Sequence, residues 1–252
     1  MPDIATHFIV GNQIKEELDS ELAKKLDKGL YELGLQGPDF LYHYKPLKKT
    51  HIRAMGDVIH NTSGFNFFGK YCDGRTINNK MLSYLVGYIC HYALDVICHP
   101  LVNKTANYTS IGHRNVETDL DFAIFEKYKI KKDRRKCVPV NIDYELLAEF
   151  YGFETKDMKL CHSYMKRNIS LLRHSRAVKI VDDFMKRKGN FICYTFRGEK
   201  VHYANRPVIN ELLRLVEEGR KQAPVLIKSF LKAVKYKDKK LLVGFEKDFN
   251  GI

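Results

Sequence analysis

The stretch Met81–Pro100, MLSYLVGYICHYALDVICHP, is strongly apolar and contains no lysine or arginine. Its length up to Cys98 is sufficient for a helix that crosses a membrane. However, His91 and Asp95 lie in its interior, where ionisable groups are costly in hydrocarbon. The pattern therefore favours a buried central helix that ends near Cys98, because Pro100 disfavours helical geometry at the residue before it.

Polar residues recur at a helical spacing through this segment and the next. His91 and Asp95 are one turn apart and share a helix face, and His99 lies one turn further on. After another 13 residues, His113 and Glu117 repeat the same spacing. One such pair is usually only a hydrogen-bonded pair. Two pairs and His99 on consecutive helices favour a metal site, because neutral imidazole and carboxylate are ligands of zinc and similar ions.

The rest of the chain shows mainly helical periodicity. Gly64–Gly74 is expected to be a loop, and the alternation over 191–203 predicts a small β-hairpin. The predicted fold class is all-α, a single multi-helical domain over residues 1–252 with one small hairpin near 191–203. Further helices are expected over Asn12–Leu30, Lys48–Asn61, Ile111–Tyr128, Ile142–Phe153, Asp157–Lys188 and Pro207–Tyr236.

Composition limits the class of protein and its partners. Hydrophobic residues make up 44% of the 252 residues and charged residues 29%, which allows a core and excludes global disorder. The formal net charge of +13 favours anionic partners such as phosphate esters, acidic lipid surfaces or nucleic acid. Six cysteines without a CxxC pair predict reduced thiols. No secretory signal is visible, so either the mature start is shown or, as we expect, the protein is cytoplasmic, with membrane association left open.

The order of the polar residues resembles the zinc-dependent phospholipase C family, which is related to the S1/P1-type nucleases. The resemblance runs from His7 through Gly37-Pro38-Asp39 and Gly56-Asp57-Val58-Ile59-His60 to the segment His91–Glu117, just under half of the chain. It implies an all-helical fold of the phospholipase C/P1 nuclease type that holds two or three zinc ions in a cleft.

The resemblance also implies which residues bind each ion. The first zinc would be held by Asp39, His60, His91 and Asp95, the second by Asp95, His7 and the N-terminus, and the third by His99, His113 and Glu117. Secreted relatives begin with a tryptophan that ligates zinc, but this chain has no tryptophan. We therefore expect that Met1 is removed and that Pro2 supplies its nitrogen and carbonyl oxygen.

The implied activity is that of a zinc-dependent phosphodiesterase, a phospholipase C-type hydrolase in which a zinc-bound hydroxide attacks the phosphodiester. Asp39 would act as the catalytic carboxylate that orients this water or accepts its proton. The expected partner is a phospholipid or another phosphodiester. The oligomeric state is left open.

Two alternatives remain from the sequence. One is an S1/P1-like single-strand nuclease, and the other is a non-catalytic protein that the metal stabilises and that binds membrane or nucleic acid. Basic runs such as Lys127–Lys136 and Lys235–Lys240 are usually solvated, but they could contact an anionic membrane surface. Nucleic acid is possible but is the less favoured partner.

Overall fold

The computed structural model describes residues 4–74, 76–109, 112–131, 133–171 and 205–252. Over these residues the secondary structure is helical and contains no strand, apart from one isolated bridge between Ser63 and Asp248. The predicted all-α class is confirmed. The hairpin expected near 191–203 lies outside the described residues.

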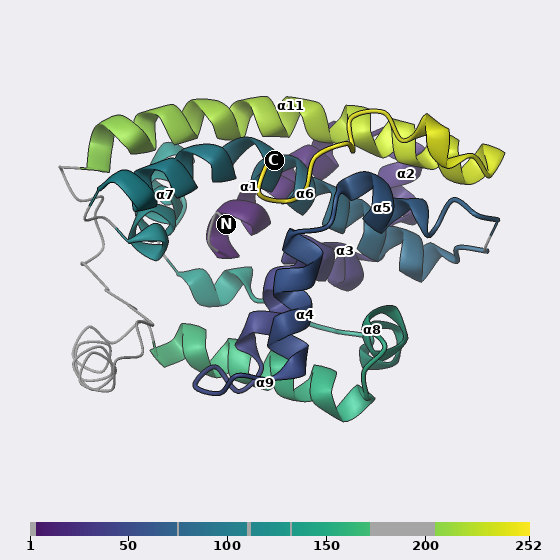
Figure 1. Ribbon diagram of the computed structural model, residues 1–252, viewed down its shortest axis with the longest axis horizontal. Helices are drawn as coiled ribbons and strands as arrows, with labels where there is room; N and C mark the ends of the chain where they lie inside the picture. Colours follow the sequence, from purple (N-terminus) through teal and green to yellow (C-terminus); the bar gives the residue numbers. More distant parts are fainter. Residues whose placement is uncertain (1–3, 75, 110–111, 132, 172–204) are drawn as a thin grey trace.

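Helix α6 (Asn79–Tyr108) forms the centre of the molecule (Figure 1). The long helix α11 (Arg206–Tyr236) packs along one side of it, and α3 (Lys28–Gly34) packs against it as well. By length and composition α6 could cross a membrane, but 83% of its most apolar window is buried inside the protein. It is therefore the central core helix that the sequence predicted.

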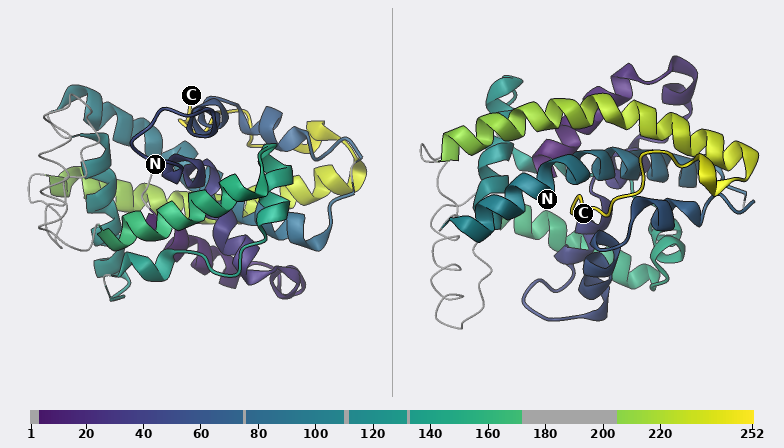
Figure 2. Two further views of the ribbon diagram at one scale, coloured as in Figure 1. Left: turned by 90° about the horizontal axis from the view of Figure 1, so that it is seen from below. Right: turned by 45° about the horizontal axis from the view of Figure 1, so that its top comes forward.

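The remaining helices surround this centre. Helices α1 (Ile4–Glu17) and α7 (His113–Lys127) each contact both α6 and α11. The segment η1 (Gly37–His43) packs against α4 (His51–His60) and against α9 (Thr155–Leu171). Helix α9 packs in turn on α8 (Tyr144–Tyr151), and both lie below α6 (Figures 1 and 2). The other described elements are α2 (Ser20–Lys25), α5 (Gly64–Gly69), η2 (Arg134–Cys137) and η4 (Lys239–Leu241).

One continuous apolar core connects these elements and includes residues from Ile4 to Phe249. Its aromatic part lies beside α6, where the Phe249 ring contacts Phe67, Tyr88 and Tyr92 at centroid distances of 4.9–6.0 Å. The cysteines of the described residues are buried free thiols, as expected. The C-terminal residues thus complete the core next to the central helix.

The single helix predicted over Asn12–Leu30 is wrong. The chain forms α1, α2 and α3 there, because two aspartates end the helical run by capping new helices. The Asp19 carboxylate accepts hydrogen bonds from the amides of Glu21 and Leu22, and Asp27 accepts one from the Leu30 amide. The apolar periodicity correctly indicated helix, but the two capping aspartates divide the segment into three separate helices.

Two further boundaries differ from expectation. Helix α6 continues past Pro100 to Tyr108. The proline loses the hydrogen bond to the Val96 carbonyl and crowds that carbonyl, but the buried residues on either side still pack into the core and maintain the helix. The expected loop over Gly64–Gly74 begins with α5, whose first turn is capped by the Ser63 hydroxyl.

Candidate metal centre

The eight predicted ligands come from five elements, yet their side chains gather along one side of α6. Ligand atoms lie within 4.8 Å of one another in three groups. The groups are His7, Asp39 and His91; His60, His91 and Asp95; and His99, His113 and Glu117.

Asp95 belongs to the second group and lies beside the first. Its Oδ1 lies 3.2 Å from His7 Nε2, and its Oδ2 lies 3.0 Å from His91 Nε2. Nitrogens of His60 and His99 lie 3.7 and 3.9 Å from Oδ2. Burial opposes ionisation of this carboxyl, but the imidazoles of His91 and His99 outweigh burial and hold the pKa of Asp95 well below its usual range. Asp95 is thus a buried carboxylate surrounded by imidazoles.

Several polar atoms of this cluster are buried without a hydrogen-bond partner. They are both ring nitrogens of His7, Asp39 Oδ1, the Nε2 atoms of His60 and His91, and both carboxylate oxygens of Asp95. Buried polar atoms without partners are rare in proteins and cost free energy. Burial and His91 also lower the pKa of His7, which favours its neutral, ligating form. Donor type and burial both fit bound zinc ions.

Backbone carbonyls orient three of the imidazoles. His91 Nδ1 donates to the Leu35 carbonyl at 3.1 Å, and His60 Nδ1 donates to the Gly56 carbonyl at 2.8 Å. His99 Nδ1 donates to the Phe249 carbonyl at 2.5 Å. Because a carbonyl can only accept, the hydrogen must be on Nδ1, which leaves each Nε2 able to bind a metal.

Gly37 brings Asp39 to the cluster. Its φ of +50° lies in the left-handed region, and a Cβ built at this position would meet the His91 ring at 2.4 Å. The η1 turn therefore approaches α6 closely only because residue 37 has no side chain. Asp39 follows two residues later, with Oδ1 at 3.3 Å from His60 Nε2.

We expect Gly37→Ala to lower stability by about 2 kcal/mol or more, since it combines backbone strain with a clash against a ligand ring. It should also weaken zinc binding, as measured by thermal unfolding and metal content. Gly152→Ala is the matched control, because Gly152 has a φ of +71° with nothing within 4 Å of the added Cβ. If both variants lost the same amount of zinc, the close approach of Gly37 to the His91 ring would not be what maintains the metal centre.

The third group lies nearer the surface. His113 Nε2 and Glu117 Oε1 are 2.6 Å apart, and the His113 side chain is 38% exposed whereas that of Glu117 is 8% exposed. The ring of His99 lies 5.9 Å from that of His113. A metal held by these three residues would therefore be the one most open to solvent.

Asp121 anchors the start of α1 beside the cluster, a role that the sequence alone did not predict. Its carboxylate accepts hydrogen bonds from the Ala5 and Thr6 amides at 3.2 and 2.8 Å, and from the Thr6 hydroxyl at 2.7 Å. Arg134 Nε lies 3.1 Å from the same carboxylate. Asp121 thereby fixes the first turn of α1 just before His7. The available signal was its position one turn after Glu117, which continues the same spacing.

Asp121→Asn is expected to lower stability by about 3 kcal/mol, because it breaks a buried charged pair and removes an acceptor from the first turn of α1. A loss of that size corresponds to a fall in melting temperature of about 6–12 °C. Zinc bound through His7 should also be held less tightly. The control is Asp143→Asn, which keeps an oxygen to cap α8 but removes the charge that pairs with Lys80, and should cost about 1 kcal/mol or less. A milder effect at Asp121 than at Asp143 would contradict this anchoring role.

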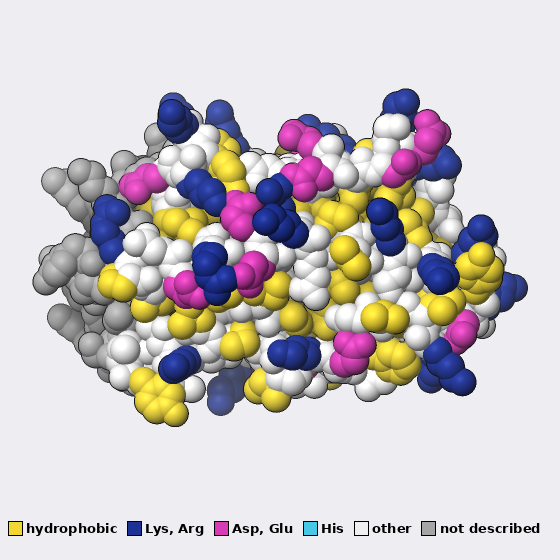
Figure 3. All heavy atoms as spheres, turned by 90° about the horizontal axis from the view of Figure 1, so that it is seen from above, with side chains coloured by type: hydrophobic (Ala, Val, Ile, Leu, Met, Phe, Trp, Pro, Cys, Tyr) yellow, Lys and Arg dark blue, Asp and Glu magenta, His cyan; other side chains and the backbone are white. Residues whose placement is uncertain are grey.

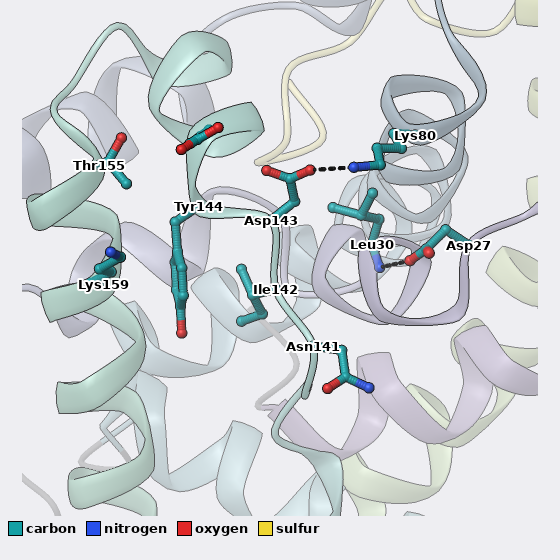
Figure 4. Close-up of a pocket in the computed structure, with 10 residues that line it drawn as sticks. Asp27, Leu30, Lys80, Asn141, Ile142, Asp143, Tyr144, Thr155 and Lys159 are labelled. Carbon is teal, nitrogen blue, oxygen red and sulfur yellow. Dashed lines mark hydrogen bonds and ion pairs between the residues drawn. The ribbon is translucent and has the colours of Figure 1, made fainter.

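A separate cavity of about 430 Å³ lies between α3, the start of α6, α8 and α9 (Figure 4). Lys80 and Asp143 form an ion pair of 2.8 Å across it. The predicted metal ligands do not line this cavity. It is therefore distinct from the histidine–carboxylate cluster.

The helical fold and the three ligand groups define an all-α protein with a centre suited to several metal ions. The family described as zinc dependent phospholipase C matches residues 6–156, more than half of the chain and a range that includes all eight predicted ligands. The chain belongs to the zinc-dependent phospholipase C family, and it is a zinc-dependent phosphodiester hydrolase of the phospholipase C type. No curated protein and no solved structure matches it.

Proposed function

We propose that the eight clustered residues bind two or three zinc ions, one at His99, His113 and Glu117 and the others around Asp95, and that the substrate is a phospholipid. The observation that carries this proposal is the set of buried ligand atoms around Asp95 that have no hydrogen-bond partner. The family supports zinc and a phospholipid substrate. Pro2, expected to complete one site, lies outside the described residues.

The burial of each ligand side chain indicates its role in the proposed reaction. Zinc at these positions would lower the pKa of bound water and offset the negative charge of the phosphodiester. His7, His91 and Asp95 are almost fully buried, so they serve to bind and orient. The Asp39 side chain is 13% exposed and lies beside the ligand atoms, so it is placed to hold or accept a proton from water at the cluster. The products would be a phosphomonoester and the released alcohol.

The face of the molecule that carries α11 is poorly suited to bind an anionic membrane. Lysine and arginine side chains alternate with acidic side chains on this face (Figure 3). Arg214 pairs with Glu211 and Glu218, and Arg220 pairs with Glu17 and Glu217. If the net charge of +13 directs the protein to acidic lipid, another face would have to make the contact.

The test combines metal analysis with a panel of substrates. We expect plasma mass spectrometry of the purified protein to find zinc, and the protein to hydrolyse bis-p-nitrophenyl phosphate and phosphatidylcholine. Asp39→Asn should reduce turnover strongly while the deeper ligands still retain zinc. Hydrolysis of single-stranded DNA alone would indicate the nuclease alternative. Bound zinc without hydrolysis of any of these substrates would indicate a non-catalytic binding protein.

A further inference from the structure

Residues 245–252, here named the C-terminal strap, turn back from the end of α11 and lie over α6 (Figures 1 and 2). The strap is bonded to two helices. The Gly64 and Phe65 amides at the start of α5 donate to strap carbonyls at 2.8 and 2.5 Å. The Tyr92 hydroxyl of α6 donates to the Lys247 carbonyl at 2.8 Å.

The strap reaches two of the predicted zinc ligands. The carbonyl oxygen of Phe249 accepts the hydrogen bond from His99 Nδ1 at 2.5 Å. The Phe249 amide and the Asn250 side-chain amide both donate to the backbone carbonyl of His60, at 3.2 and 3.1 Å. The Phe249 ring also lies 5.8 Å from the ring of His60. One short segment therefore contacts ligands from both α4 and α6.

The position of the strap is closely fixed. Gly251 has a φ of +79°, and a Cβ there would lie 2.4 Å from the Val96 carbonyl and 2.7 Å from the Pro100 ring. The Asp248 carboxylate accepts hydrogen bonds from the amides of Asn250 and Ile252, which closes the end of the strap into a turn. The turn thus rests on α6 at the residue that follows His99.

We propose that the C-terminal strap is a positioning element for the zinc site of His99, His113 and Glu117. Its Phe249 carbonyl holds the hydrogen of His99 on Nδ1 and keeps Nε2 directed to the metal. The inference rests on the proposed function, because it takes His99 to be a zinc ligand. The family match ends at residue 156, so the strap lies outside the matched region.

Two variants test the strap in the zinc-loaded protein. A chain ending at Asp248 lacks the Phe249 carbonyl, and Gly251→Ala keeps every contact group but pushes the strap away from α6. The measurements are zinc per chain, the rate of zinc transfer to a colorimetric chelator, and the melting temperature. Loss of such outer hydrogen bonds typically weakens metal binding about 10–100-fold. We expect one zinc equivalent to be released correspondingly faster and the others to be affected much less, because the strap's hydrogen bonds to His60 reach its backbone carbonyl and not its ring.

Leu147→Ala is the control for general destabilisation, because Leu147 is buried in α8 and is not a predicted ligand. It should lower the melting temperature without selective release of one zinc. If the shortened chain does not fold, Gly251→Ala alone decides. Unchanged zinc release in Gly251→Ala, or the same selective release in Leu147→Ala, would overturn the proposal. An unmodified protein without zinc would instead refute the proposed function itself.

Discussion

Asp95→Asn is expected to abolish zinc binding around the first two ligand groups and to lower phosphodiesterase activity by roughly 10³-fold or more. Both carboxylate oxygens of Asp95 face imidazole nitrogens across a possible metal position, with Oδ1 3.2 Å from His7 Nε2 and Oδ2 3.0 Å from His91 Nε2. Asparagine keeps the shape but replaces one oxygen with an amide nitrogen, which donates hydrogen bonds and does not ligate zinc. Zinc content and turnover of bis-p-nitrophenyl phosphate measure the two effects.

Asp119→Asn is the matched control for this experiment. Asp119 is also a buried carboxylate, and it accepts a hydrogen bond from the Asn205 side chain outside the ligand groups. This variant should lose stability but retain its zinc. If Asp95→Asn bound as much zinc as the unmodified protein, the proposed centre would be wrong.

Removal of zinc is expected to give the largest loss of stability. At free zinc about 1,000 times above the dissociation constant, each bound ion stabilises the folded state by about 4 kcal/mol. For a chain of this size that corresponds to about 8–16 °C in melting temperature for each site. The metal-free protein also retains the buried unpartnered atoms around Asp95. Differential scanning calorimetry before and after treatment with a chelator measures the change.

The control for zinc removal is reconstitution. Added zinc should restore both the melting temperature and the turnover, whereas magnesium, which prefers oxygen ligands, should restore neither. A melting temperature that stays the same after mass spectrometry shows complete loss of zinc would contradict a stabilising role for the metal.

The sequence predicted the part of the centre that local geometry determines. The spacing of His91, Asp95 and His99 alone places them on one helix face. In the structure each of the three belongs to at least one of the ligand groups. His7, Asp39 and His60 have no such spacing, so only the family resemblance could bring them to the same place. The structure assembles them because α1 and η1 pack on α6 and α4 packs on η1.

Other features were beyond a local reading of the sequence. The rule that proline ends a helix failed at Pro100, because tertiary packing maintains α6 beyond it. The strap carbonyl of Phe249 could not be predicted, since every residue has a carbonyl and its role depends on where the chain returns. Asp121 acts through backbone amides that lie 115 and 116 residues away in sequence.

The burial of α6 has a consequence for synthesis of the protein. Helix α11, which covers one side of α6, begins at residue 206, about 100 residues after α6 ends. While the ribosome is making the intervening residues, a helix apolar enough to resemble a membrane span is left without that cover. Partly covered apolar chains aggregate readily. Newly made molecules should therefore depend on chaperones during this interval, and fragments that stop before α11 should accumulate as insoluble material.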